Sequence, residues 1–268
     1  MRVSLGDGSL NVVDQGSGEV IVLVHGFPLD HSMWRGQIDA LAAKYRVIAP
    51  DLRGFGQSEP TEGTLTMAAQ AADLLKMLDA LEITGPVVVC GLSMGGYVAM
   101  QFWKQYENRL RGLVLCDTRA MGDTPEAAAN RLAMAEKVMK EGSQVAADAM
   151  LPKLFAPDSE KSQAEIVQAT KEVILKTSPA TIAAAQRGMS ERLDMRSTLT
   201  IMQCPTLVVC GEHDVISPVD EMNAMAEALP LSQFEVIAGA GHMSPLEKPQ
   251  AFTKVLLDWL AKLDANDK

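Results

Sequence analysis

The chain has 268 residues, of which 47% are hydrophobic and 22% charged, enough to build the core of a single α/β domain. Its net charge of −10 at pH 7 argues against a nucleic-acid-binding surface and against attraction to an anionic membrane. The four cysteines show neither a C-x-x-C pattern nor a Cys/His metal spacing. The N-terminus has no secretory apolar segment, and no apolar run approaches membrane-spanning length. These features predict a cytoplasmic protein with buried free thiols, no cysteine-based metal site and no nucleic-acid or membrane partner.

The first 118 residues alternate short apolar runs with helical patterns. Gly6-Asp7-Gly8 predicts a hairpin turn between the first two strands. The later runs are continuously apolar, which is typical of strands buried on both faces of a parallel sheet. The strands predicted in this part are 2–5, 11–14, 20–24, 46–49, 87–90 and 113–116. Helices are predicted over 32–43 and 65–81, the second with Thr64 or Thr66 as its N-cap.

The pattern changes between residues 119 and 198, where no strand-like run occurs and Ala, Met, Glu and Lys dominate. We expect a helical cap, or lid, inserted into a core domain made of 1–118 and 199–268. Prolines are expected to separate its helices, at Pro125, Pro152, Pro157 and Pro179. Beyond the insertion the sequence predicts strands at 206–210 and 234–237, a helix at 219–229 and an amphipathic closing helix at 252–263.

Strands that alternate with helices predict the α/β class, here a mostly parallel eight-stranded sheet with helices on both faces. Right-handed crossovers place the carboxyl ends of parallel strands along one edge of the sheet. Ligands bind at that edge in α/β proteins. We therefore expect a site built from the loops that follow Val24, Cys90, Cys116, Cys210 and Ile237.

Gly91-Leu92-Ser93-Met94-Gly95 is a G-x-S-x-G pattern between a predicted buried strand and a predicted helix. That context is the one in which the pattern presents a nucleophilic serine on a sharp turn. Glycines at both ends let the turn close without Cβ clashes. The helix N-terminus points at the Ser93 hydroxyl, and the backbone N–H of Met94 is free to donate to an oxyanion.

A serine hydroxyl near neutral pH needs a base, and the base needs an orienting carboxylate. Among the four histidines, only His242 lies on a glycine-flanked loop directly after the last predicted strand. Asp214 and Asp117 each follow a predicted strand and could both reach the same edge. The order Ser93, Asp214, His242 fits the Ser…acid…His order of such sites, and Asp117 remains an alternative acid.

Together these motifs resemble the carboxylesterase and enol-lactonase branch of the α/β-hydrolases, over essentially the whole chain. The resemblance implies Ser93 as nucleophile, His242 as base and Asp214 as the residue that orients it. It also implies an oxyanion hole made by the backbone N–H groups of Phe27 and Met94, and no cofactor. The segments that carry it are His25-Gly26-Phe27-Pro28, residues 51–58, Gly91-Leu92-Ser93-Met94-Gly95-Gly96, Gly211-Glu212-His213-Asp214 and Gly241-His242.

Other residues near these motifs are expected to support the site. His25 is expected to brace the oxyanion loop, His31 and His213 to be solvated or to act behind the site, and residues 51–58 to form a scaffold turn. The methionines of the insertion could supply an adaptable apolar pocket: Met121, Met134, Met139, Met150, Met189 and Met195.

The expected activity is hydrolysis of small carboxylic esters or lactones through an acyl-enzyme at Ser93. An enol-lactonase of the 3-oxoadipate type would also need a cation for the substrate carboxylate, for which Arg119, Arg131, Arg187 and Arg192 are candidates. Perhydrolysis or haloperoxidase chemistry with the same triad, C–C hydrolysis of a vinylogous ketone and a non-enzymatic small-molecule receptor remain alternatives. Haloalkane dehalogenation is disfavoured because its nucleophile is a carboxylate.

Overall fold

The computed structural model describes residues 1–61 and 63–266, and an eight-stranded sheet runs through it in the order β1-β2-β4-β3-β5-β6-β7-β8. The strands from β3 to β8 are parallel to one another, and β2 is antiparallel to both β1 and β4. The mostly parallel α/β sheet predicted from the sequence is confirmed. The strands are β1 Arg2–Ser4, β2 Ser9–Gly16, β3 Val20–Val24, β4 Arg46–Pro50, β5 Val87–Leu92, β6 Leu110–Cys116, β7 Thr206–Gly211 and β8 Ser232–Ile237.

Every residue of β5 and of β7 is buried, because helices cover both faces of the sheet and exclude water from it. The helices α1 and α12 pack together, as do α2 and α3. Thr66 caps α2 by accepting a hydrogen bond from Ala69 N. The covering helices are α1 Arg35–Leu41, α2 Met67–Ala80, α3 Met94–Tyr106, α10 Val219–Ala228, α11 Ser244–Glu247 and α12 Pro249–Asn266, with 3-10 turns at His31–Trp34 and Glu107–Arg109.

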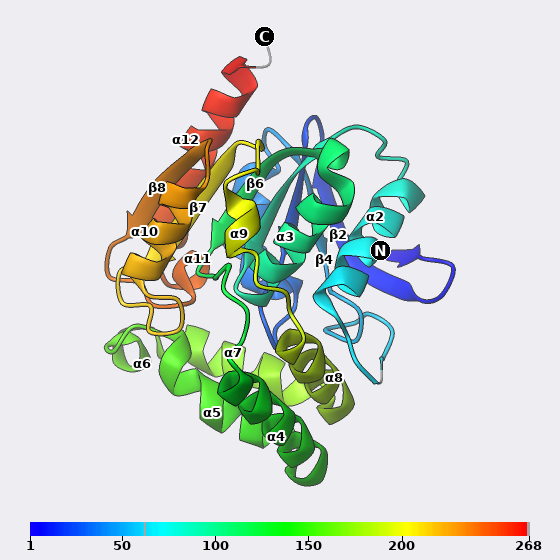
Figure 1. Cartoon of the computed structure of the whole chain (residues 1–268), viewed down its shortest axis with the longest axis vertical. Helices are drawn as coiled ribbons and strands as arrows, with labels where there is room; N and C mark the ends of the chain where they lie inside the picture. The colour runs from blue at the N-terminus through cyan, green and yellow to red at the C-terminus, as the bar shows by residue number, and fades with distance from the viewer. Residues whose placement is uncertain (62, 267–268) are drawn as a thin grey trace.

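The first five helices between β6 and β7, which we call the cap helices, gather at the lower end of the view in Figure 1. No strand occurs among the described residues of this segment. Its division from the core at residues 119 and 198 stays a prediction. The cap helices are α4 Pro125–Glu141, α5 Gln144–Leu154, α6 Ser159–Ser162, α7 Ala164–Lys176 and α8 Pro179–Ser190, and the short α9 Arg196–Leu199 follows them.

One proline of the insertion behaves differently from the expectation. Pro125 and Pro179 begin α4 and α8, where a missing N–H costs nothing. Pro152, however, lies inside α5 and does not separate two helices. The helix ends two residues later, so the proline removes one backbone hydrogen bond close to an end that would fray in any case.

The four cysteines are buried and free, as predicted. Cys90 and Cys116 lie on neighbouring strands with their sulfur atoms 3.8 Å apart. Within residues 1–61 and 63–266, no helix combines the length and the apolar character needed to cross a bilayer.

Candidate active site

Ser93 stands at the sharp turn between β5 and α3, with φ +54° and ψ −114°. A non-glycine residue at positive φ is strained and persists only where its surroundings hold it. Here the Ser93 N–H donates to Cys116 O at 2.9 Å, and Ser93 O accepts from Thr118 Oγ1 at 2.7 Å. The turn after β6 therefore fixes the backbone of the serine that the sequence singles out.

The glycines on either side of Ser93 are required by close backbone approach. A Cβ on Gly91 would lie 2.2 Å from Gly95 O, and a Cβ on Gly95 would lie 2.3 Å from Val24 O. Real Cβ atoms do not tolerate such distances. The G-x-S-x-G spacing is thus a packing requirement of this turn.

The loop after β3 lies directly against Ser93, since a Cβ placed on Gly26 would be 3.5 Å from Ser93 Cβ. Its shape depends on the buried His25. The N–H of Leu52 donates to His25 Nε2 at 2.9 Å, so Nδ1 carries the proton and donates to Gly26 O at 2.9 Å. Burial lowers the pKa of His25, which keeps this neutral tautomer.

The bond to His25 also decides where the Phe27 N–H points. Gly26 O accepts from both His25 Nδ1 and Leu29 N. In a trans peptide the N–H points opposite to the carbonyl, so the Phe27 N–H faces away from the His25 ring. In the part of the chain that the structure describes, neither this N–H nor that of Met94 donates to a protein group.

His242 and Asp214 form a buried pair at the ends of β8 and β7. His242 Nδ1 donates to Asp214 Oδ2 at 2.8 Å. The same carboxylate accepts from the Ser217 hydroxyl at 2.5 Å and from the N–H groups of Ile216 and Ser217. Burial alone would raise the pKa of Asp214, but the hydrogen bond and charge of His242 and the bonds from Ser217 outweigh it and lower the pKa.

Ser93 and His242 belong to the same edge of the sheet but are not bonded to each other. Within the described residues no hydrogen bond joins Ser93 Oγ to His242 Nε2. Such catalytic contacts are often open in a ligand-free protein and tighten around substrate.

Among the described residues, Asp117, the alternative acid, makes no hydrogen bond to the His242 ring or to the Ser93 hydroxyl. It accepts from Gly211 N at 2.7 Å, and it shares a 2.5 Å hydrogen bond with the Ser244 hydroxyl. Burial and the charge of Asp214 raise its pKa well above the usual range. The hydrogen bonds of this carboxyl group join the ends of β6 and β7 to the start of α11. The partner of the histidine is therefore Asp214.

The segment 51–58 acts as a scaffold, as the sequence suggests. Buried Asp51 accepts from the His31 ring at 2.6 Å and from the N–H of Gln57 at 2.9 Å. These bonds outweigh the effect of burial and lower the pKa of Asp51 to about 2. Arg53 pairs with Asp73 at 2.7 Å. His31 is thus engaged by a carboxylate, which the sequence does not reveal.

The His31–Asp51 pair predicts a pH-dependent contribution to stability. The bond to Asp51 raises the pKa of His31, so this contribution is complete below the unfolded value of about 6.5 and is lost as pH rises through the folded value. Replacing His31 with glutamine should therefore lower the free energy of unfolding more at pH 6 than at pH 9, measured by urea denaturation. In an Asp51→Asn background this difference should disappear, and a difference that survived would contradict the pairing.

Among the residues that the structure describes, two groups of side chains have the spacing of metal ligands: Asp30, His31 and Asp51 together, and Asp117, Cys210 and Asp214 together. The first group is occupied by its own hydrogen bonds, since Asp30 caps Ser32 and Asp51 binds His31. The second is part of the arrangement around His242. The hydrogen bonds that each group makes explain its geometry without a metal ion.

Comparison with known proteins decides the family. The sequence pattern described as alpha/beta hydrolase fold matches residues 19–249. The chain belongs to the alpha/beta-hydrolase fold family. It is 30% identical to 3-oxoadipate enol-lactonase 1 of Acinetobacter baylyi, over 88% of this chain and 86% of that protein.

Two solved hydrolases share the fold closely. The structure of a thermophilic esterase from Thermogutta terrifontis with malate bound has a TM-score of 0.96 and 44% identity, covering 98% of each chain. The enol-lactonase from Burkholderia xenovorans LB400 has a TM-score of 0.90 and 28% identity, covering 97% of this chain and 100% of that one. The fold and these relatives support hydrolase activity for the chain.

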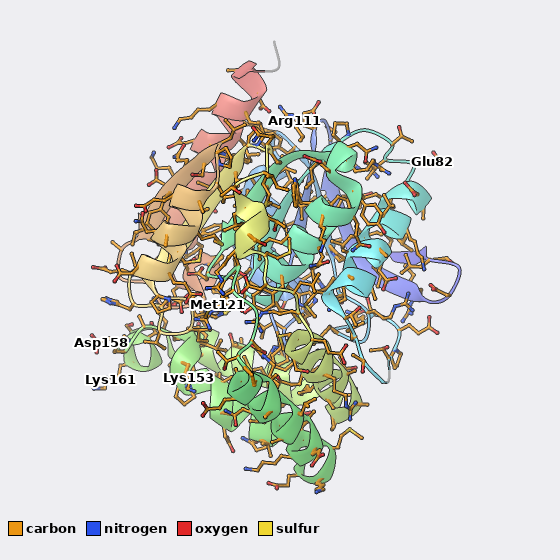
Figure 2. All side chains as sticks on the ribbon, viewed as in Figure 1. Glu82, Arg111, Met121, Lys153, Asp158 and Lys161 are labelled. Atoms are coloured by element: carbon orange, nitrogen blue, oxygen red, sulfur yellow. The ribbon has the colours of Figure 1, made fainter. Side chains whose placement is uncertain are left out.

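Each of the four arginines considered as a cation for a substrate carboxylate already has an ion-pair or hydrogen-bond partner within this hydrolase. Arg119 pairs with Glu221 at 2.8 Å, and Arg187 donates to Gly63 O at 2.9 Å. Arg131 and Arg192 share Asp123. Met121, whose carbonyl accepts from Arg192, lies where the cap helices meet the core in Figure 2. Among the methionines proposed for a pocket, Met139 on α4 is 53% exposed.

Three supporting residues were missed by the sequence analysis. Thr118 holds the Ser93 carbonyl, Ser217 holds Asp214, and Glu247 binds Gly241 N beside His242 at 2.8 Å. Their position one to five residues after a candidate active-site residue was the available signal. Serine, threonine and glutamate in loops are too common for that signal to stand out.

Proposed function

We propose that the chain is a serine esterase that hydrolyses small carboxylic esters or lactones through an acyl-enzyme at Ser93. The observation that carries the proposal is the buried His242–Asp214 bond of 2.8 Å at the sheet edge where the strained Ser93 turn ends. The esterase and enol-lactonase relatives point to the same reaction class.

In the first step Ser93 Oγ attacks the carbonyl carbon of the substrate. His242 Nε2 accepts the serine proton as the new C–O bond forms. Asp214 keeps the proton on Nδ1, which leaves the Nε2 lone pair free to act as base. Its lowered pKa keeps the carboxylate charged beside the imidazolium.

The tetrahedral intermediate places negative charge on the former carbonyl oxygen. The N–H groups of Phe27 and Met94 are the proposed donors to it, held by the His25 brace and by the N-terminus of α3. Each such donor is typically worth about 10² to 10³ in rate. Because the donors are backbone groups, their placement depends on the loop and not on a side-chain rotamer.

Collapse of this intermediate expels the alcohol, which takes the proton from His242. Water then enters, gives a proton to the same nitrogen and attacks the acyl carbon. The second tetrahedral intermediate releases the carboxylic acid and returns the proton to Ser93 Oγ. The cycle needs no group beyond the chain and water.

The state of the lid arginines favours neutral esters as the main substrates. Arg119, Arg131 and Arg192 are paired with carboxylates, and Arg187 is bound to a carbonyl. A substrate carboxylate would have to compete with these bonds. A neutral acyl group needs no such exchange.

A lactone that carries a carboxylate is the second candidate, favoured by one observation. Asp123 neutralises only one of the two arginines that share it, which leaves one positive charge. Arg192 also lies over the ring of Tyr97, 4.6 Å from its centroid, one helical turn after Ser93. The enol-lactonase relatives make this charge relevant.

A matched pair of substrates separates the two candidates. The valerate and hemisuccinate esters of p-nitrophenol have similar acyl lengths and differ by a terminal carboxylate. The proposal predicts a higher kcat/KM for the valerate. A hemisuccinate preference of ten-fold or more, lost in Arg131→Gln, would favour the lactone candidate, and absence of turnover on either ester and on lactones would overturn the hydrolase assignment.

A further inference from the structure

Glu247 is a buried carboxylate that connects the His242 loop to the cap helices. Its side chain lies at the end of α11 and is 4% exposed. Oε1 accepts from Gly241 N at 2.8 Å, and Oε2 accepts from Ala156 N at 2.8 Å and Ser159 Oγ at 2.7 Å. A buried carboxylate is tolerated only with such donors, so Glu247 requires both segments to be in place.

Further contacts hold the same two segments together. Met243 N donates to Leu154 O at 3.0 Å, and Gln163 Nε2 donates to the backbone carbonyl of Glu247 at 3.2 Å. A Cβ on Gly241 would lie 2.5 Å from Ala156 N. The residues before and after His242 are therefore both in direct contact with the segment 154–156.

The residues at the start of α6 differ in exposure. Figure 2 shows Asp158 and Lys161 at the outer edge of the molecule, and both are exposed. Ser159 lies between them in sequence but is buried, with its hydroxyl on Glu247. The serine thus belongs to the contact with the His242 loop.

These contacts complete the support of His242 from two directions. Asp214 holds the ring through Nδ1. Glu247 and Leu154 hold the backbone N–H groups of Gly241 and Met243, on either side of the histidine. An error of about 1 Å in the position of a catalytic group can cost about 10² in rate, so support of this backbone bears directly on the reaction.

We propose that Glu247 is a positioning residue. Its carboxylate binds both the cap segment 154–159 and the backbone beside His242, so that the position of the histidine depends on the position of the cap segment. The cap is then a fixed part of the catalytic apparatus at this end and not a freely opening lid. This inference rests on the proposed function of Ser93 and His242.

Glu247→Gln tests the proposal, because glutamine keeps the size but loses the charge and one acceptor atom. At 25 °C, kcat for p-nitrophenyl acetate should fall ten- to a hundred-fold while KM changes less than three-fold. The matched control is Glu212→Gln, an exposed carboxylate that accepts from Gly239 N at 2.8 Å in the same loop; its kcat should stay within two-fold. A residue with only a structural role would lower the melting temperature without this selective loss of kcat.

Ser159→Ala removes one donor on the cap side and should lower kcat three- to ten-fold. Added to Glu247→Gln it should cause no further loss, because both act through one contact. If Glu247→Gln is not recovered folded, Ser159→Ala alone decides the matter. Wild-type kcat in Ser159→Ala, or in folded Glu247→Gln, overturns the positioning role. Ser93→Ala, measured in parallel, tests the proposed function separately, since only its retained activity would overturn that function.

Discussion

Replacing Ser93 with alanine should lower kcat for p-nitrophenyl acetate by about 10⁶, the loss seen when a catalytic serine is removed elsewhere. The change removes the attacking oxygen and leaves the turn backbone, which is held by Cys116 and Thr118, in place. Initial rates followed by release of p-nitrophenol, with active-site concentration known, give the measurement.

Ser162→Ala is the matched control for Ser93→Ala. Ser162 is exposed at the end of α6, and within the described part of the chain its hydroxyl bonds only to Asp158 O, at 2.9 Å. Its kcat should equal that of the wild type. A Ser93→Ala protein that is folded and keeps more than a tenth of wild-type kcat would contradict the assignment of the nucleophile.

Asp214→Asn should lower kcat by about 10⁴, as loss of the orienting carboxylate does in other serine triads. The amide no longer holds the proton on Nδ1 of His242, so the tautomer with a free Nε2 lone pair is lost. The loss should be visible under saturating substrate, because it concerns the chemical step.

The neighbouring Asp117 provides an isosteric control for Asp214. Burial and the charge of Asp214 raise the pKa of its carboxyl group, and an asparagine keeps the size of this side chain without a charge. Asp117→Asn should lower kcat less than ten-fold. A larger loss in Asp117→Asn than in Asp214→Asn would reverse the roles that the geometry indicates.

Much of the fold follows from local sequence patterns. The strands from β3 to β7 each contain a continuous apolar run, and their alternation with helices predicts the parallel sheet. The same reasoning predicts which loops share an edge, because parallel strands end on the same side. It fails at Pro152, where the outcome depends on how soon the helix ends and not on the proline alone.

The candidate site likewise contains residues that the sequence predicts and residues that only the folded structure reveals. Ser93, Asp214 and His242 are accessible to sequence reasoning because each follows a strand in a recognisable motif. The choice between Asp214 and Asp117 needs the position of the histidine ring, which no spacing supplies. The support from Ser217 and Glu247 and the pairing of His31 with Asp51 depend on contacts between loops. These contacts exist only once the chain is folded.

The most direct test of the central claim is covalent labelling with diethyl p-nitrophenyl phosphate, followed by peptide mapping by mass spectrometry. The account predicts release of one equivalent of p-nitrophenol and a diethylphosphoryl group on Ser93, with the rate of labelling greatly reduced in His242→Ala. A label on another residue, or steady ester hydrolysis by a protein that takes no label, would contradict it.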